Sequence, residues 1–219
     1  MPGSNHMRRA KVTLARRKQI YLGLLCAFAI LVGLLYWFVK GDDPFRSGQM
    51  ATYMTGELLS FELHPPQAAL LTTSFLKEDG STTNLEAYRG KVILLNLWAT
   101  WCAPCLHEMP TLDRLQGAMG SDDFEVLAVS VDRGELEKSA LFLRRTGAEH
   151  LDLLVDETQK LNFDFKAYQL PTTLLLDREG REIGRIAGDV VWDSPEVKAF
   201  LTKVIEKTAP APDEMTQPG

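Results

Sequence analysis

Cysteine is scarce in this chain of 219 residues, which contains only Cys26, Cys102 and Cys105, together with four histidines. A structural zinc site needs a second pair of ligands beside one Cys-x-x-Cys, and the histidines show no H-x3-5-H spacing. The sequence therefore predicts no metal site, and it predicts no other cofactor. A purely structural disulfide between Cys102 and Cys105 is an alternative, although so short a loop constrains the unfolded chain little.

Acidic residues are absent from the first 40 residues, which hold seven of the 24 Lys and Arg side chains. The remaining 179 residues hold 17 basic and 29 acidic side chains, a formal charge of −12. Nucleic-acid binding requires a basic face, so this acidic excess argues against a nucleic-acid partner. The excess keeps the domain soluble and at most favours basic partner surfaces.

Charge is also missing from residues 20–39, a run of 20 mostly apolar residues long enough to cross a bilayer core of about 30 Å. The basic residues before this run place the N-terminus in the cytoplasm and the rest of the chain in the periplasm. A cleaved signal peptide is the alternative, but the run exceeds the usual apolar region of about 7–15 residues and no small-x-small site follows it. We therefore expect an uncleaved single-pass anchor in the inner membrane, with Cys26 as one of its apolar residues.

The motif Cys102-Ala103-Pro104-Cys105 follows an apolar, strand-like run at residues 91–97. Pro104 suits the first turn of a helix, where its missing N–H costs nothing. A thiol at a helix N-terminus faces unpaired backbone N–H groups and the positive end of the helix dipole, which favour its thiolate. The arrangement predicts thiol–disulfide exchange, with Cys102 attacking and Cys105 resolving the mixed disulfide.

Two features near the cysteines bear on the reaction. The pair Ala103-Pro104 carries no charge, which gives the thiolate little extra stabilisation and favours a reducing couple. Glu108 lies three residues after Cys105 on the same helical face, where a carboxylate could take or give the proton of Cys105. A solvated helix residue is the alternative for Glu108.

We expect the chain to divide into five segments. They are a basic cytoplasmic segment, a transmembrane anchor, a linker ending at two prolines, one domain and a disordered tail, at residues 1–19, 20–39, 40–66, 67–207 and 208–219. A hairpin is expected at residues 71–85, turning at Asp79-Gly80. Further strands are expected at 91–97, 124–131, 151–155, 172–177 and 181–186, and helices after the cysteine motif and at 135–145, 157–167 and 195–207. The order of elements predicts an α/β domain in which strands 91–97 and 124–131 are parallel.

The stretch WCAPC, the following C-x-x-E-x-P with Glu108 and Pro110, and Leu170-Pro171-Thr172-Thr173 resemble the TlpA/ResA branch of membrane-anchored thioredoxin-like reductases, with TlpA-like members nearest. The resemblance covers roughly residues 67–207. It implies a thioredoxin-like fold, a central mixed sheet flanked by helices, with an N-terminal hairpin and a helix–strand insertion before Pro171.

The resemblance also implies a cis peptide bond at Leu170-Pro171 that faces the cysteines and presents the Leu170 backbone to an extended substrate. Trp101, Ala103, Pro104 and Leu170 are the expected substrate-binding residues, and Trp98 is expected to fill the core. Thioredoxin keeps a buried acid at the position matching Asn96, so Glu108 is left as the acid beside the pair.

The implied function is that of a periplasmic thiol:disulfide reductase for respiratory-chain assembly proteins, supplied with electrons by a transmembrane donor of the DsbD/CcdA type. The TlpA likeness favours copper-site proteins of cytochrome oxidase as substrates. Apocytochrome c is the alternative, although Gln169-Leu170-Pro171-Thr172-Thr173 departs from the Gly-Ala-Pro-Glu-Thr of cytochrome-maturation members.

Two other classes of protein fit the sequence less well. A Cu(I) carrier would use Cys102 and Cys105 as soft ligands, but Sco-like carriers have a longer cysteine spacing and a distant histidine, and His150 has no obvious place in such a site. A thiol peroxidase would need Pro-x-x-x-Thr-x-x-Cys, and position 95 is Leu.

Overall fold

The computed structural model describes residues 25, 27–34, 45, 48–68, 72–134 and 136–209. The chain forms two compact units, residues 1–43 and 44–219. Most of the predicted anchor at residues 20–39, including Cys26, lies outside the described residues, as does most of the predicted tail.

In the first unit, residues 27–34 are helical and their apolar side chains are exposed. Among the residues that the structure describes, none of the helices combines the length and the apolar character needed to cross a membrane.

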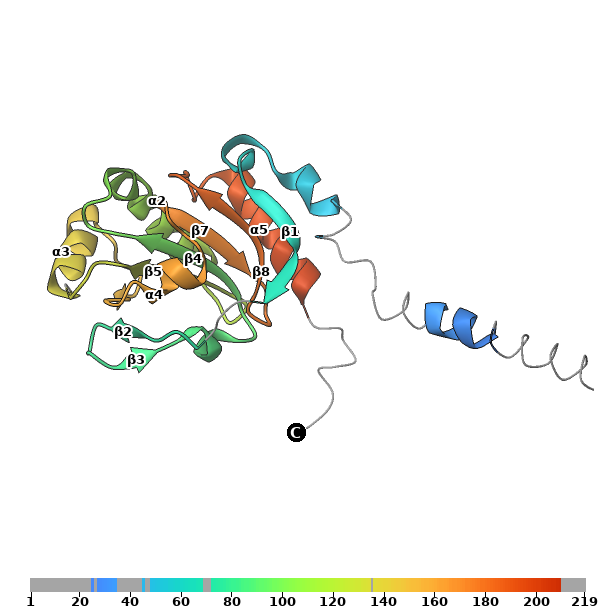
Figure 1. The fold of residues 1–219 in the computed structure, drawn as a ribbon. Helices are drawn as coiled ribbons and strands as arrows, with labels where there is room; N and C mark the ends of the chain where they lie inside the picture. Colours follow the sequence, from blue (N-terminus) through green and yellow to red (C-terminus); the bar gives the residue numbers. More distant parts are fainter. Residues whose placement is uncertain are drawn as a thin grey trace, which may run out of the picture. The chain divides into compact units, whose positions relative to one another are not determined.

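The second unit is built on a sheet with the strand order β1-β8-β7-β4-β5-β6-β2-β3. Its strands are β1 (Glu62–Ala68), β2 (Phe75–Lys77), β3 (Thr82–Thr83), β4 (Val92–Trp98), β5 (Phe124–Ser130), β6 (Leu154–Val155), β7 (Thr172–Leu176) and β8 (Arg181–Ala187). The pairs β4–β5 and β5–β6 are parallel, whereas β4–β7 and β7–β8 are antiparallel, so the sheet is mixed as predicted. Figure 1 shows α5 and β1 at one side of this unit and α3 at the other.

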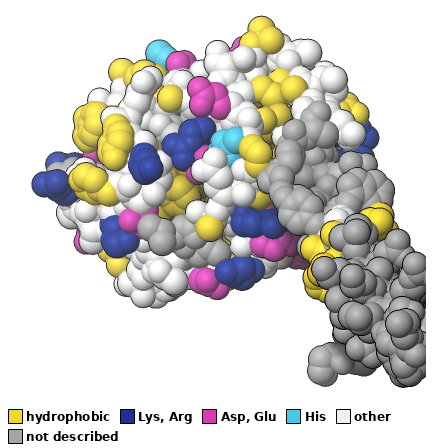
Figure 2. Space-filling model, turned by 45° about the vertical axis from the view of Figure 1, so that its right-hand side comes forward, with side chains coloured by type: hydrophobic (Ala, Val, Ile, Leu, Met, Phe, Trp, Pro, Cys, Tyr) yellow, Lys and Arg dark blue, Asp and Glu magenta, His cyan; other side chains and the backbone are white. Residues whose placement is uncertain are grey.

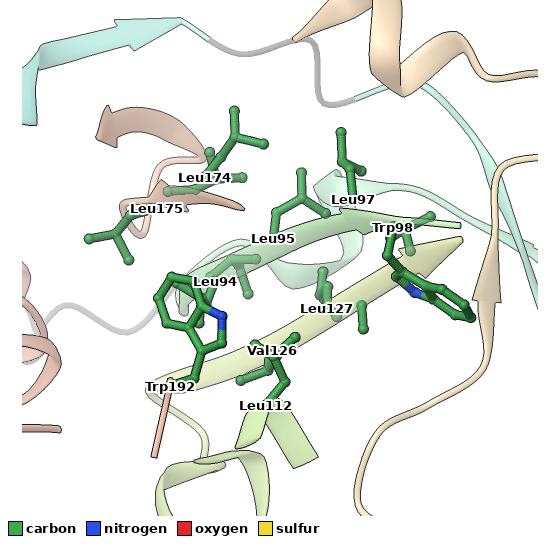
Figure 3. Packing of buried hydrophobic residues seen from close by; sticks show 14 of the residues in the cluster. Leu94, Leu95, Leu97, Trp98, Leu112, Val126, Leu127, Leu174, Leu175 and Trp192 are labelled. Carbon is green, nitrogen blue, oxygen red and sulfur yellow. The ribbon is translucent and has the colours of Figure 1, made fainter. Parts of the chain in front are cut away.

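The centre of the sheet is buried on both faces and mostly apolar. All seven residues of β4 are buried, because both faces of the sheet are covered there. Figure 3 shows Leu94, Leu95 and Leu97 of β4 beside apolar side chains of β5, β7 and the helix α2 (Ala103–Met119). Trp98 is fully buried, as predicted, and its ring packs against Phe142 with centroids 4.7 Å apart.

Local signals set the ends of the helices. The α5 helix (Pro195–Thr208) begins after Ser194, whose side chain accepts a hydrogen bond from the Val197 N–H, and Pro195 occupies its first turn. The segment between β5 and β7 contains α3 (Leu136–Thr146), β6 and α4 (Lys160–Asp164). The predicted helix–strand insertion is therefore confirmed, although α4 is shorter than the helix expected at 157–167. The hairpin predicted at 71–85 is confirmed by the antiparallel pair β2–β3.

The assignment of residues 40–66 to a linker is wrong for the part that the structure describes. This part forms two 3-10 helices, η1 (Gln49–Tyr53) and η2 (Gly56–Leu58), and strand β1. Met50, Leu58 and Phe61 are buried, and the Phe61 ring packs edge-to-face on Phe200 of α5. A short 3-10 helix, η3 (Leu85–Tyr88), follows β3.

The two prolines of this segment explain the error. Pro65-Pro66 argues against a strand because proline donates no ladder hydrogen bond. However, β1 is the terminal strand of the sheet and its register shifts between Leu63 and Gln67, where the prolines lie. An edge strand with a bulge tolerates proline because the missing N–H is not needed there.

Candidate active site

The site begins where β4 ends and α2 begins. Cys102 is the N-cap of α2 and forms a disulfide with Cys105 in the first turn. The backbone N–H of Cys105 donates to Cys102 Sγ at 3.3 Å. Cys102 is 5% exposed and Cys105 is 0% exposed, so Cys102 is the one of the two residues with any surface in contact with solvent. After reduction, this helix end favours a thiolate on Cys102.

Pro171 lies at the same end of the sheet as the disulfide. In the antiparallel pairing of β4 and β7, Leu97 is opposite Thr172, which places Pro171 opposite the last residue of β4. The Leu170-Pro171 bond is cis, as predicted. The carbonyl of Pro171 accepts a hydrogen bond from the N–H of Gly188, and Gly188 has the positive φ of 110° that favours glycine.

Glu108 is buried in α2, one turn after Cys105, with an exposed fraction of 1%. Asn96 Nδ2 donates to Glu108 Oε1 at 2.7 Å, and Trp192 Nε1 donates to Glu108 Oε2 at 3.0 Å. Burial raises the pKa of Glu108 to about 7, against the lowering effect of the Trp192 and Asn96 hydrogen bonds. The charge of Asp189 raises the pKa as well. The alternative of a solvated helix residue is therefore excluded.

Hydrogen bonds connect the loop after β8 to α2 next to Glu108. The hydroxyl of Thr111 donates to the carbonyl of Glu108 at 2.7 Å and accepts from the backbone N–H of Trp192 at 3.1 Å. Asn96 Nδ2 also donates to Thr173 Oγ1 at 2.9 Å, which ties β7 to the same network. Two strands, β4 and β7, and the loop after β8 thus position one carboxyl group whose pKa lies near neutral pH.

The sequence profile of the AhpC/TSA family matches residues 60–181, more than half of the chain. The chain belongs to the AhpC/TSA family.

Relatives of this AhpC/TSA member are named as thioredoxin-like and thiol:disulfide interchange proteins. The thioredoxin-like protein YneN of Bacillus subtilis is 36% identical over 160 residues, which cover 69% of this chain and 80% of YneN. The thiol:disulfide interchange protein HelX of Rhodobacter capsulatus is 28% identical over 169 residues, covering 77% of this chain and 86% of HelX. The predicted class, a thioredoxin-like thiol:disulfide oxidoreductase, is confirmed.

Solved structures agree on the fold. The crystal structure of DsbE, a thiol:disulfide interchange protein from Chlorobium tepidum, superposes with a TM-score of 0.57 at 23% identity, covering 65% of this chain and 99% of that chain. At this identity the likeness shows the fold alone, and it confirms the predicted thioredoxin-like α/β architecture.

The surface around the disulfide is apolar and open in this AhpC/TSA member. Trp101 is 69% exposed, and Ala103, Pro104 and Leu106 of α2 are exposed beside it. Leu170 is half-buried. Tyr168, three residues before Pro171, is 78% exposed.

The structure provides no evidence of a metal centre in the part of the chain that it describes, where no group of three or more His, Cys, Asp or Glu could hold an ion. His150 Nδ1 lies 3.0 Å from Asp113 Oδ2, and a Cβ at Gly117 of α2 would lie 2.9 Å from its ring. His150 therefore packs on α2 as part of an ion pair, while His107 is exposed.

Trp192→Phe is expected to move the titration of Glu108 to higher pH. The charged carboxylate would lose an N–H donor, and a hydrogen bond to a charged group corresponds to about one pH unit or more. Carboxyl chemical shifts followed across pH 5 to 9 would measure the midpoint. Trp98→Phe is the matched control, since Trp98 is equally buried and its Nε1 has no partner among the described residues. Equal midpoints in the two variants would contradict the assignment of Trp192.

Proposed function

We propose that this protein is a membrane-anchored thiol:disulfide reductase that acts on cysteine pairs of proteins in the periplasm. The observation that carries the proposal is the disulfide at the N-terminus of α2, with Cys102 slightly exposed, Cys105 fully buried and Glu108 buried one turn further on. In this arrangement one sulfur can meet a substrate while the other stays protected until it is needed.

The reaction then proceeds in two exchanges. In the reduced enzyme, the Cys102 thiolate attacks one sulfur of a substrate disulfide, forming a mixed disulfide and releasing the other substrate sulfur as a thiolate. Cys105 loses its proton and attacks Cys102 Sγ, which releases the second substrate thiolate and leaves the Cys102–Cys105 disulfide seen in the structure. Two electrons pass from the enzyme to the substrate.

Glu108 is the proposed proton carrier for Cys105. A group with a pKa of about 7 is present in both forms near neutral pH, so it can accept and return a proton without a large cost. A charged Glu108 would also oppose a neighbouring Cys105 thiolate, which keeps Cys105 a thiol until the mixed disulfide has formed.

The exposed side chains around the disulfide are the proposed binding surface for an extended substrate segment. Trp101, Ala103 and Pro104 would contact it on one side and the backbone of Leu170, next to Pro171, on the other. The face of the molecule in Figure 2 carries Lys, Arg, Asp and Glu side chains between separate hydrophobic groups rather than a basic patch. This mixture fits a protein substrate better than a nucleic acid.

The proposed direction of electron transfer and the proposed location in the cell rest on the sequence. The neutral pair Ala103-Pro104 favours a reducing couple, and a reductase in an oxidising periplasm needs a donor such as a DsbD/CcdA-type membrane protein. Residues 20–39, preceded by basic residues, would anchor the chain in the inner membrane with residues 44–207 outside the cytoplasm and a tail after them. Copper-site assembly proteins of cytochrome oxidase are the proposed substrates, ahead of apocytochrome c.

Capture of substrates in cells tests the proposal. Cells expressing the full chain with Cys105→Ser should accumulate mixed disulfides through Cys102, because the resolving thiol is missing. The adducts should be found in the membrane fraction and contain exported proteins with cysteine pairs, whose identity separates the copper and cytochrome branches. The Cys102→Ser chain is the matched control and should capture far less. Adducts with cytoplasmic proteins alone would contradict the location, and no adducts would contradict the reductase function.

A further inference from the structure

Asp132 is a buried carboxylate that the exchange steps above do not use. It lies two residues after the end of β5 and is 3% exposed. Its Oδ2 accepts hydrogen bonds from the backbone N–H of Thr100 at 2.7 Å and from Ser130 Oγ at 2.9 Å. Its Oδ1 accepts from Thr100 Oγ1 at 3.2 Å. A carboxylate is costly to bury, so a fixed set of donors of this kind calls for an explanation.

Thr100 is the residue that both Asp132 oxygens contact, and it lies in the turn that delivers the attacking cysteine. In this turn the N–H of Cys102 donates to the carbonyl of Ala99 at 3.1 Å. Immediately before it, the N–H of Val131 donates to the carbonyl of Trp98 at 2.8 Å. The residues that follow β5 therefore hold this segment by hydrogen bonds at Thr100 and Trp98, two and four residues before Cys102.

Ser130, which donates to Asp132, in turn accepts a hydrogen bond from Ser139. Ser139 of α3 is fully buried and its hydroxyl donates to Ser130 Oγ at 2.8 Å. The N–H of Asp132 lies 3.3 Å from Ser130 Oγ, within hydrogen-bond distance. These contacts connect α3 to the turn through the chain Ser139, Ser130, Asp132 and Thr100, and none of the donors in it carries a charge.

We propose that Asp132 is a positioning residue of the exchange reaction, which holds the turn at residues 99–102 so that Cys102 Sγ and the exposed Trp101 meet a substrate together. The inference rests on the proposed role of Cys102 as the attacking thiol. The proposed role depends on the two carboxylate oxygens of Asp132, both of which accept hydrogen bonds from Thr100. Without them, the turn that separates a buried strand from the helix N-terminus would lose its fixed geometry.

If Asp132 acts as a hydrogen-bond acceptor, its replacement by asparagine should preserve the turn. In Asp132→Asn, the amide oxygen can take the place of Oδ2 and accept from the Thr100 N–H and the Ser130 hydroxyl. The amide NH₂ then faces Thr100 Oγ1, which can accept because a hydroxyl is both donor and acceptor. Asp132→Asn should therefore keep the turn in place, whereas Asp132→Ala leaves the Thr100 N–H without its partner.

The test measures two rates on the full-length reduced chain. One is alkylation of Cys102 by iodoacetamide, and the other is exchange with an oxidised peptide that contains one disulfide. Asp132→Ala should slow peptide exchange by about tenfold or more, since a small misplacement of a reacting group costs up to about a hundredfold. Asp132→Asn should stay within about threefold of the parent. Ser139→Ala removes only the outer hydroxyl and leaves every hydrogen bond that the Asp132 carboxylate accepts in place, so it should lower the melting temperature and slow exchange much less than Asp132→Ala.

Three results would overturn the proposal. The first is an exchange rate of Asp132→Ala equal to that of the parent. The second is an equal loss of exchange rate in Asp132→Ala and Asp132→Asn, which would point to the charge, and the third is an equal loss in Ser139→Ala, which would point to general support of the fold. If Asp132→Ala does not fold, Asp132→Ser replaces it, since the shorter serine side chain lacks the two carboxylate oxygens that accept from Thr100 but keeps a polar group at this position. A parent that does not exchange with the peptide refutes the proposed function instead, and the alkylation rates still test the position of Cys102.

Discussion

Cys102→Ser is expected to lower the turnover of disulfide exchange by more than about a thousandfold, because a serine hydroxyl cannot replace the thiolate as nucleophile. In the structure Cys102 is the N-cap residue of α2 and has some exposed surface, whereas Cys105 has none. In the reduced parent, iodoacetamide near neutral pH should therefore label Cys102 well before Cys105. Mass spectrometry of the quenched protein would give both rates.

The third cysteine provides the control for this experiment. Cys26→Ser removes a thiol that lies outside the described residues and outside the proposed site, so turnover and the labelling order should not change. Preferential labelling of Cys105, or a Cys102→Ser chain that still turns over, would reverse the proposed roles of the two sulfurs.

The parts of the fold that the sequence predicted correctly depend on local signals. Strand β4 is an apolar run interrupted only by Asn96, the start of α2 is marked by a proline within the cysteine motif, and α5 has both a serine cap and a proline. Each of these signals lies within a few residues of the feature that it sets. The cysteine pair was predicted for the same reason.

The parts that were missed depend on contacts between distant residues. The sequence carries a weak signal that Trp192 borders the site, but not that it donates to Glu108 across 84 positions. Asp132 contacts Thr100 across 32 positions, and an isolated Asp outside any motif is compatible with a core or a surface role. Strand β1 was missed because its prolines are acceptable only at an edge with a bulge, and the position of a strand within the sheet is a property of the whole fold.

The state of Glu108 could not have been predicted from its spacing alone. The i, i+3 relation to Cys105 gives the helical face but not the depth of burial. The depth comes from β4 on one side and the loop with Trp192 on the other, which supply the donors Asn96 Nδ2 and Trp192 Nε1. Burial outweighs these donors, and as a result the pKa of Glu108 is raised to about 7.

This raised pKa predicts a large dependence of stability on pH. In the unfolded chain Glu108 titrates near its ordinary pKa of 4.5, and in the folded chain near 7. Between these values the folded state holds a proton that the unfolded state has lost, so the free energy of unfolding falls as the pH rises. The stabilisation from protonated Glu108 is complete below about pH 4.5 and is lost by about pH 7 to 8, a decrease of about 3 kcal/mol.

Glu108→Gln should remove this dependence and be more stable than the parent at pH 8 by about 3 kcal/mol. Glutamine resembles the protonated acid, with one acceptor oxygen for Trp192 Nε1 and an NH₂ group in place of the other oxygen. That NH₂ needs an acceptor, and the buried Asn96 Oδ1, which has no partner in the described part of the chain, becomes one if the Asn96 amide turns over. The substitution can therefore be accommodated without an unsatisfied donor at Glu108.

Urea unfolding of the oxidised parent and of Glu108→Gln between pH 5 and pH 8 would measure the effect. All other titrating groups are shared, so the difference between the two unfolding free energies isolates Glu108. This difference should widen steadily in favour of glutamine as the pH rises. In the same variant the pH–rate curve of exchange should lose the inflection near pH 7, because the titrating carboxyl is gone. Parallel stability curves at every pH, together with unchanged pH–rate curves, would show that Glu108 is charged at no great cost in the folded protein and does not govern the proton of Cys105.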